Sequence, residues 1–190
     1  MKTFRHQRGF SLVEVLVTLV VTTVALLSSA SLQLLSKRSN YDAAQRTTAA
    51  HLANDLFNRM RSNPEALFAY IPGGTLGGGS LGTAPGSDCL DPGVTCTDAQ
   101  MAAFDLWQWE QHMDGMLEER ANKGTGGLSN AAACITGPGG TGNYSIAIAW
   151  RGMTDTVNPA TDNCGVGIGD YGTGNVYRRV LVIRSFIGAS

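Results

Sequence analysis

The most informative stretch of the chain is Gly9-Phe10-Ser11-Leu12-Val13-Glu14, which precedes 22 consecutive uncharged residues at positions 15–36. Before it, the first nine residues contain Lys2, Arg5 and Arg8 and no acid. At about 1.5 Å per residue the uncharged segment would form a helix of roughly 33 Å, enough to cross a hydrocarbon core of about 30 Å. The basic flank predicts that the N-terminus stays in the cytoplasm and that everything after residue 36 lies outside it.

Two ordinary membrane segments are the alternatives to consider. A cleaved signal peptide has a shorter apolar segment, of about 7 to 15 residues, and a small-x-small cleavage site, whereas residues 26–36 offer only loose Ala and Ser sites. A plain single-pass anchor does not explain Glu14, because a carboxylate deep in a bilayer costs about 2.5–3.5 kcal/mol. We therefore expect Glu14 to have a cationic partner, the alternative being an interfacial acid near the positive end of its own helix.

With its short basic leader and apolar helix, the stretch at residues 9–14 resembles the N-terminal motif of type IV pilins and their relatives. The resemblance implies that a prepilin peptidase cleaves after Gly9 and that the new terminal residue, Phe10, is N-methylated. It also implies that Glu14, about 6 Å along the helix from that terminus, pairs with the terminal amine of a neighbouring subunit. Such a desolvated pair would fix register more than it adds stability. Cleavage would leave 11 Lys and Arg against 15 Asp and Glu.

The pattern beyond the apolar segment predicts that the helix continues. From Lys37 the sequence becomes amphipathic, and Asn63-Pro64 ends the run because the residue before a proline avoids helical angles. The expected organisation is a leader at 1–9, a transmembrane and filament-core half at 10–36, an amphipathic half at 37–63 and a globular head at 64–190. One helix of about 50 residues, roughly 75 Å long, would then run through both halves. Its core-facing residues are expected to be Ala49, Leu52, Ala53, Leu56 and Met60.

The head combines irregular, helical and extended segments. Residues 72–87 contain seven glycines and two prolines and predict an irregular connection. Thr97 and Gln100 have the spacing of a capping box, so a second helix is expected over about 97–122. Residues 144–150 and 177–186 have the composition of strands. With the resemblance, this predicts an α+β, pilin-like fold in which the long N-terminal helix packs on a small antiparallel sheet with a second helix.

Four cysteines, Cys89, Cys96, Cys134 and Cys164, lie on the expected exported side, where disulfides form. Three connectivities are possible. We prefer Cys89 with Cys96 and Cys134 with Cys164, because local closure is the least demanding and leaves the second pair to tie the glycine-rich loops.

Enzymes, nucleic-acid binders and metalloproteins are disfavoured. The net charge of -1 lacks the basic footprint of a nucleic-acid binder. Glycine patterns that match a nucleophile elbow (residues 78–82) or a dinucleotide fingerprint (residues 77–82) lack the required strand and helix, and are expected by chance among 24 glycines. Asp155, Asp162 and Asp170 match no calcium-loop spacing, and the cysteine separations do not suit zinc. We expect no catalytic residues, no cofactor and no metal.

The head and residues 52–64 resemble PilV-type minor pilins, in which a cysteine-bounded loop precedes a Trp-rich helix and a final hydrophobic hairpin. The chain differs from many major pilins at Ser31 and His51, where prolines are frequent, and in its last cysteine, which lies 26 residues before the end. The resemblance implies a minor pilin that takes part in type IV pilus assembly and initiation and supports twitching motility and adhesion. Its implied partners are other minor and major pilins, prepilin peptidase and the inner-membrane assembly platform, without nucleic acid. It would occupy the bacterial inner membrane before assembly and the pilus or cell surface afterwards.

Two other functions remain open from the sequence. A type II secretion pseudopilin shares the leader, the helix and Glu14, and calcium ligands in the head would favour it. A membrane-anchored periplasmic hydrolase or binding protein would show turnover or a tight small ligand and would be indifferent to Glu14.

Overall fold

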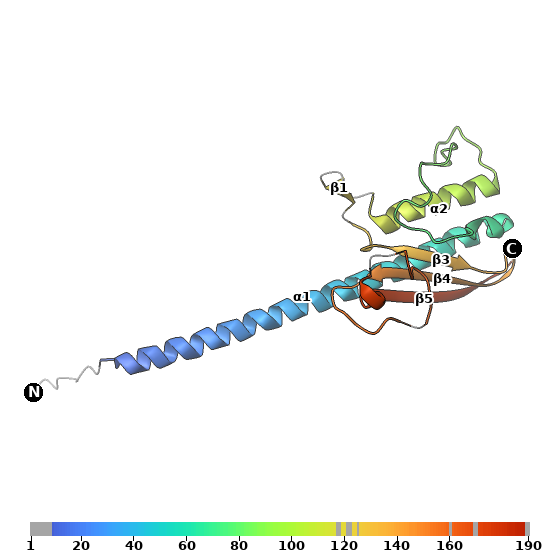
Figure 1. Ribbon diagram of the computed structural model, residues 1–190. Helices are drawn as coiled ribbons and strands as arrows, with labels where there is room; N and C mark the ends of the chain where they lie inside the picture. The colour runs from blue at the N-terminus through green and yellow to red at the C-terminus, as the bar shows by residue number, and fades with distance from the viewer. Residues whose placement is uncertain are drawn as a thin grey trace, which may run out of the picture. The chain divides into compact units, whose positions relative to one another are not determined.

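The computed structural model describes residues 9–116, 119–120, 123–124, 126–159, 161–168 and 171–188. The chain forms two compact units, residues 1–40 and 41–190, of which the second is the head. Helix α1 (Leu12–Ser62) has 51 residues and belongs to both units (Figure 1). The predicted helix of about 50 residues is therefore confirmed, and it ends directly before Asn63-Pro64 as expected.

Besides the end of α1, the described part of the head contains three helical segments and two sheets. Strands β3, β4 and β5 form a three-stranded antiparallel sheet with β4 in the middle, and β1 pairs with β2 separately. A long apolar helix packed on an antiparallel sheet with a second helix is the predicted α+β, pilin-like fold. Strand β3 was not expected. The elements that follow α1 are η1 (Pro64–Tyr70), α2 (Asp98–Asp114), β1 (Glu119–Arg120), β2 (Lys123–Gly124), β3 (Ala132–Thr136), β4 (Gly142–Arg151), η2 (Thr173–Asn175) and β5 (Arg178–Ile187).

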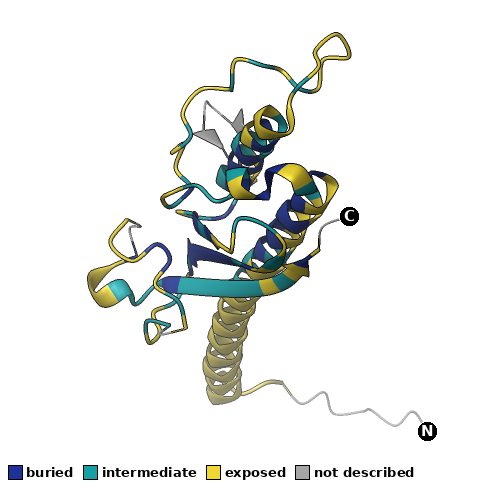
Figure 2. Ribbon diagram, turned by 90° about the vertical axis from the view of Figure 1, so that its right-hand side faces the viewer, coloured by how far each residue is buried: buried dark blue, intermediate teal, exposed yellow. Residues whose placement is uncertain are grey.

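The core of the head lies around the second half of α1, which is placed between the sheet and α2 (Figures 1 and 2). Burial of apolar area is the main stabilising contribution here. The expected stripe on α1 is buried throughout, together with Phe57. The largest side chains that pack on it are Trp109 and Met113 of α2, Tyr70 of η1, and Tyr144, Ile146, Ile148 and Trp150 of β4.

Helix α2 begins as predicted but ends earlier. Thr97 and Gln100 form the reciprocal capping box, with each side chain bonded to the other residue's backbone N–H. The helix stops at Asp114 rather than near residue 122, because Gly115 adopts a left-handed conformation with φ of 73° and terminates it. A helix continued to about residue 122 would place Met116 and Leu117 on the same apolar stripe as Trp109 and Met113. Instead Met116 is 44% exposed, and Leu117 lies outside the described residues.

Both disulfides are present in the preferred pairing. Cys89 bonds to Cys96, and Cys134 on β3 bonds to Cys164. The second bond holds the long connection between β4 and β5 against the sheet, where Cys164 is buried. The two bonds therefore restrain different regions, the loop before α2 and the connection before β5.

Candidate functional site

The motif at the N-terminus lies at the exposed start of α1. The carbonyl of Ser11 accepts hydrogen bonds from the backbone N–H of Glu14 at 3.0 Å and of Val15 at 3.2 Å, which starts the helix. Phe10 is 85% exposed, and a Cβ on Gly9 would have no neighbour within 4 Å. The peptide bond between Gly9 and Phe10 is therefore outside the helix and sterically open, as proteolysis requires. Leader residues 1–8 lie outside the described residues.

Glu14 lies in the first turn of α1 and is exposed. Across the described parts of the chain its carboxylate makes no hydrogen bond and no ion pair. An acid in the first turn interacts favourably with the helix dipole, but such an exposed contact contributes only about 0.3–1 kcal/mol. The Glu14 carboxylate is thus available to a partner outside this chain.

Every residue of α1 up to position 40 is exposed, as the yellow colour of this part of the helix shows (Figure 2). From Leu12 to Leu35 the large apolar residues are between 48% and 81% exposed. Among the described residues α1 is the one helix whose length and composition suit a membrane span. Five of its hydroxyls are satisfied within the helix: Thr18, Thr22, Thr23, Ser28 and Ser31 each donate to a backbone carbonyl three or four residues earlier. Such a surface requires an apolar environment, either lipid or other helices.

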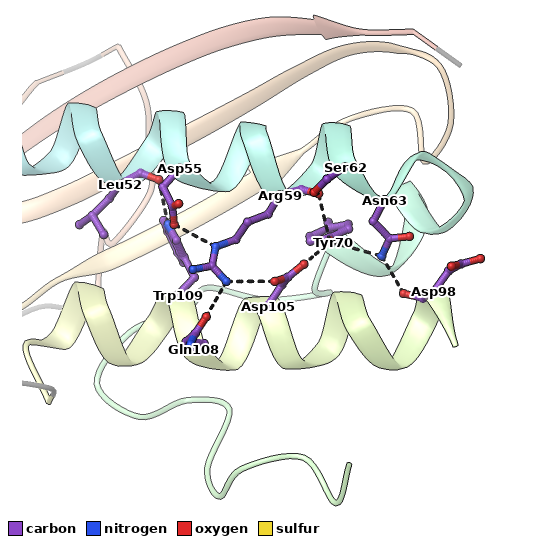
Figure 3. Close-up of polar contacts among 10 residues, drawn as sticks. All are labelled: Leu52, Asp55, Arg59, Ser62, Asn63, Tyr70, Asp98, Asp105, Gln108 and Trp109. Atoms are coloured by element: carbon purple, nitrogen blue, oxygen red, sulfur yellow. Dashed lines mark hydrogen bonds and ion pairs between the residues drawn. The ribbon is translucent and has the colours of Figure 1, made fainter. Parts of the chain in front are cut away.

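A polar network joins the end of α1 to α2 (Figure 3). The guanidinium of Arg59 donates to Asp55 at 2.9 Å, to Asp105 of α2 at 2.9 Å and to Gln108 of α2 at 2.7 Å. A spacing of four on one helix would by itself give only a solvated pair of Asp55 and Arg59, but the Arg59 side chain is 20% exposed and crosses to α2. Burial opposes its charge, yet the two carboxylates outweigh burial and raise the pKa of Arg59.

Tyr70 and Trp109 extend this α1–α2 network. The Tyr70 hydroxyl donates to Asp105 at 2.5 Å, and burial together with this bond raises the pKa of Tyr70. The indole N–H of Trp109 donates to the Leu52 carbonyl at 2.8 Å, and Asn63 donates to the Asp98 carbonyl at 2.8 Å. The end of α1 is therefore fixed against both η1 and α2 by directional bonds in addition to apolar packing.

Two family models match the chain over adjoining ranges. Residues 4–30 match the prokaryotic N-terminal methylation motif, and residues 31–107 match the family described as type IV pilin Tt1218. The two matches run continuously from the leader through α1 and into α2. The chain is a type IV pilin. Comparisons with curated proteins and with solved structures found no match.

Membership of this family identifies a non-enzymatic structural protein. The prepilin motif implies processing by prepilin peptidase and use by the pilus machinery. An apolar N-terminal helix behind such a motif is consistent with residence in the inner membrane and then in a pilus. Neither match addresses the PilV subtype.

The glycine-rich loop of this pilin binds a carboxylate from α2. Glu110 is fully buried, and its carboxylate accepts from the backbone N–H groups of Gly77, Ser80 and Leu81 and from the Ser80 hydroxyl, at 2.5–2.9 Å. Successive N–H groups that converge in this way form an anion-binding nest. The fingerprint-like glycines at 77–82 thus serve the pilin's own acid, and no separate ligand is needed to explain them.

Asp114 binds the same loop one helical turn later. It accepts from the N–H groups of Gly78 at 3.0 Å and Gly79 at 2.9 Å. Burial and the charge of Glu110 raise the pKa of Asp114, although the two N–H bonds oppose them. Gly77, with φ of 122°, lies so close to β3 that a Cβ would collide with the Ala131 carbonyl. A side chain at position 77 would therefore displace the loop.

A buried arginine organises the connection before β5. Arg178 is fully buried and donates to the carbonyls of Pro159 at 2.6 Å, Asp162 at 2.6 Å and Cys164 at 2.8 Å, and to the Asn158 side chain at 2.9 Å. Inward-facing carbonyls of this kind are also what a calcium ion would bind. Within the described residues no cluster of three acidic, His or Cys side chains has metal-binding geometry. Asp170, one of the three acids weighed for calcium, lies outside those residues.

Of the residues singled out from the sequence, the structure brings the cysteines together in pairs, whereas Gly9, Phe10 and Glu14 share one exposed helix end. Sequence analysis missed Glu110 and Arg178. The available signal was an acid on the apolar face of α2 and an arginine in an apolar strand, since charged residues at such positions usually have buried partners.

Proposed function

We propose that this pilin is a minor pilin, most like the PilV type, that takes part in assembly and initiation of the type IV pilus and so supports twitching motility and adhesion. The observation that carries the proposal is the motif at residues 9–14 on a helix whose first half has its apolar residues exposed. A helix of this kind exchanges lipid for the helices of other pilins with little hydrophobic penalty, because both surroundings are apolar.

In this proposal the peptide bond after Gly9 is cleaved by prepilin peptidase and the amine of Phe10 is methylated. The helix then packs among the helices of other pilins, where an unpaired carboxylate would be costly. Glu14 avoids this cost by pairing with the terminal amine of a neighbour. The open peptide bond at Gly9 and the Glu14 carboxylate, which has no partner among the described residues, support these roles.

The basic leader supports an orientation with the N-terminus in the cytoplasm and the head outside. The proposed partners are other minor and major pilins and the inner-membrane assembly platform. Before assembly the protein would be a single-pass inner-membrane protein, and afterwards part of the pilus at the cell surface.

A pilus role is favoured over a type II secretion role by Arg178. The carbonyls of the loop before β5 already receive hydrogen bonds from this buried guanidinium. Calcium ligands in the head would have favoured a secretion pseudopilin. Three of the carbonyls that face inward already accept hydrogen bonds from Arg178 instead.

The proposal is tested by replacing the gene with variants in the cell that carries it. Glu14→Ala is expected to reduce pilus number in electron micrographs and the diameter of twitching zones, because the carboxylate is lost, and Glu14→Gln should do the same. Glu65→Ala, which removes an exposed acid in η1, is the matched control. Unchanged pilus number and motility with Glu14→Ala, or an effect confined to protein secretion, would contradict the proposal.

A further inference from the structure

The head has an uneven distribution of charge. Residues 62–116, which include α2 and the loop before it, contain seven acids and no Lys or Arg, whereas residues 117–190 contain six Lys or Arg against five Asp or Glu. In the first region Asp105, Glu110 and Asp114 are bonded inside the head, and Asp88, Asp91 and Asp98 are exposed. The α2 side of the head is therefore an acidic surface.

This acidic surface contains an apolar groove of about 290 Å³. We call it the α2 groove; it is lined by Ala84, Pro85, Asp88, Leu90, Phe104 and Trp107. The rings of Phe104 and Trp107 lie 5.9 Å apart and are tilted, and the indole N–H already donates to the Gly82 carbonyl. Leu90 is 67% exposed although the Cys89–Cys96 disulfide fixes its loop. One oxygen of Asp88 accepts from the Leu90 N–H, and the second is unpaired among the described residues.

The opposite side of the head carries the complementary chemistry on β5. Ser185 faces α1, since its hydroxyl accepts from Arg61 at 2.6 Å. Successive side chains of a strand alternate, so Arg184 and Phe186 point to the outer face of the sheet, about 7 Å apart along the strand. Phe186 is 62% exposed, and Arg184 is exposed without a hydrogen bond or ion pair to any described residue. Their neighbours on β4, Ser145 and Asn143, are too small to cover them.

A single head does not place its own Phe186 in its own groove, because α1 lies between the sheet and α2 (Figure 3). We infer that heads of two copies of this chain associate, with Phe186 of one copy seated in the α2 groove of the next and Arg184 beside Asp88. The apolar Phe186 ring matches the groove, and the Arg184 guanidinium, unpaired within the described parts of the head, matches the acidic wall. Because groove and ring lie on opposite sides of the head, the contact is heterologous and repeats from copy to copy. The inference goes beyond the proposed function and does not depend on Gly9 or Glu14.

The contact is tested with the full chain in its own membrane by placing the photo-cross-linker p-benzoylphenylalanine at position 186. The expected product after irradiation is a covalent dimer in which position 186 is joined to residues 84–111 by mass mapping. The same amino acid at position 68 is the matched control, since Phe68 is 61% exposed but lies on η1, outside both surfaces. No dimer from position 186, a link only to another protein, or a link outside residues 84–111 would overturn the inference.

Charge variants then test the pairing itself. Arg184→Asp is expected to lower the yield of dimer from position 186 on the order of fivefold, and Asp88→Asn should also lower it while keeping the acceptor for the Leu90 N–H. Arg184→Asp together with Asp88→Arg should restore the yield. Arg46→Asp makes the same charge change at an exposed position on α1 and should leave it unchanged. Equal dimer yields for Arg184→Asp and Arg46→Asp would overturn the inference. So would a dimer yield that does not recover when the two charges are exchanged. A normal dimer with Glu14→Ala, in cells that have lost their pili, would show that the two proposals stand separately.

Discussion

Glu110 is a charged residue in an environment that solvent does not reach. It is fully buried, no cation faces it among the described residues, and its stabilisation comes from four hydrogen-bond donors of residues 77–81. Glu110→Ala is expected to lower the free energy of unfolding of the head by about 3 kcal/mol, since three N–H groups and a hydroxyl lose their acceptor. Urea unfolding followed by tryptophan fluorescence measures this.

Glu65→Ala, at an exposed acid, is the control for this substitution and should stay within about 0.5 kcal/mol of the parent. A loss with Glu110→Ala no larger than that of the control would mean that the loop does not depend on the buried carboxylate.

Asp114 makes the stability of the head depend on pH. Burial raises its pKa above the ordinary 3.8, so the folded head holds this proton more tightly than the unfolded chain. The contribution of Asp114 to stability is therefore greatest below pH 3.8 and declines as the pH rises from there through the raised pKa. Compared with Asp114→Asn, the parent should lose free energy of unfolding as the pH rises through this interval. Above it, the stability curves of the two proteins should run parallel. Urea midpoints at closely spaced pH values measure the difference, and parallel curves throughout would contradict the assignment.

Individual residues show where sequence analysis succeeds and where it stops. The pairing of Asp55 with Arg59 follows from their spacing of four on one helix, but Asp105, the third member, is 46 positions away from Arg59. Glu110 and the Gly77 amide are 33 positions apart. Local patterns contain no information about which distant segment packs opposite, so these partners emerge only from the fold.

Among the connecting elements, the two disulfides are expected to differ in their effect on stability. Cys134 and Cys164 are 30 positions apart, and Cys89 and Cys96 are seven apart. Closing the longer loop restricts the unfolded chain more, by about 1 kcal/mol on the chain-entropy estimate. The double variant Cys134→Ser with Cys164→Ser should therefore unfold more easily than Cys89→Ser with Cys96→Ser, in the same urea assay.

Cys164 is buried, so its replacement by Ser adds the loss of packing to this difference. An equal or larger loss from the Cys89 and Cys96 variant would contradict the expectation.

Helices α1 and α2 are expected to be coupled through Arg59. A double-mutant cycle of Arg59→Met and Asp105→Asn should give an interaction energy of about 1–2 kcal/mol, because the pair is largely shielded from solvent. A cycle of Arg46→Met with Asp105→Asn is the control and should give a value near zero. Equal coupling in the two cycles would show that the α1–α2 network contributes nothing specific.

The helices were predictable to the extent that local chemistry defines their ends. Pro64 marks the end of α1, and Thr97 with Gln100 marks the start of α2. The end of α2 was missed because apolar residues continue past Gly115, whose left-handed backbone stops the helix. Strand β3 was missed because it has only five residues, some of them small, and because its pairing with β4 is what makes it a strand.

For the molecule as a whole, the N-terminal motif and the change from a wholly apolar to an amphipathic helix predicted the α+β plan. Burial follows the same division, since every described residue before position 41 is exposed and the core belongs to the head. The surfaces that would contact other subunits were not predictable. The α2 groove requires the loop, the Cys89–Cys96 disulfide and α2 to be brought together.

The proposed function requires that Gly9 and Phe10 form a processing site and that the apolar helix remains in the mature protein. Both are tested by purifying the mature chain from its cell and determining its N-terminus by mass spectrometry. We expect a chain that begins at N-methylated Phe10 and retains residues 10–36. An N-terminus at Met1, or one produced by cleavage within or after residues 26–36, would contradict it.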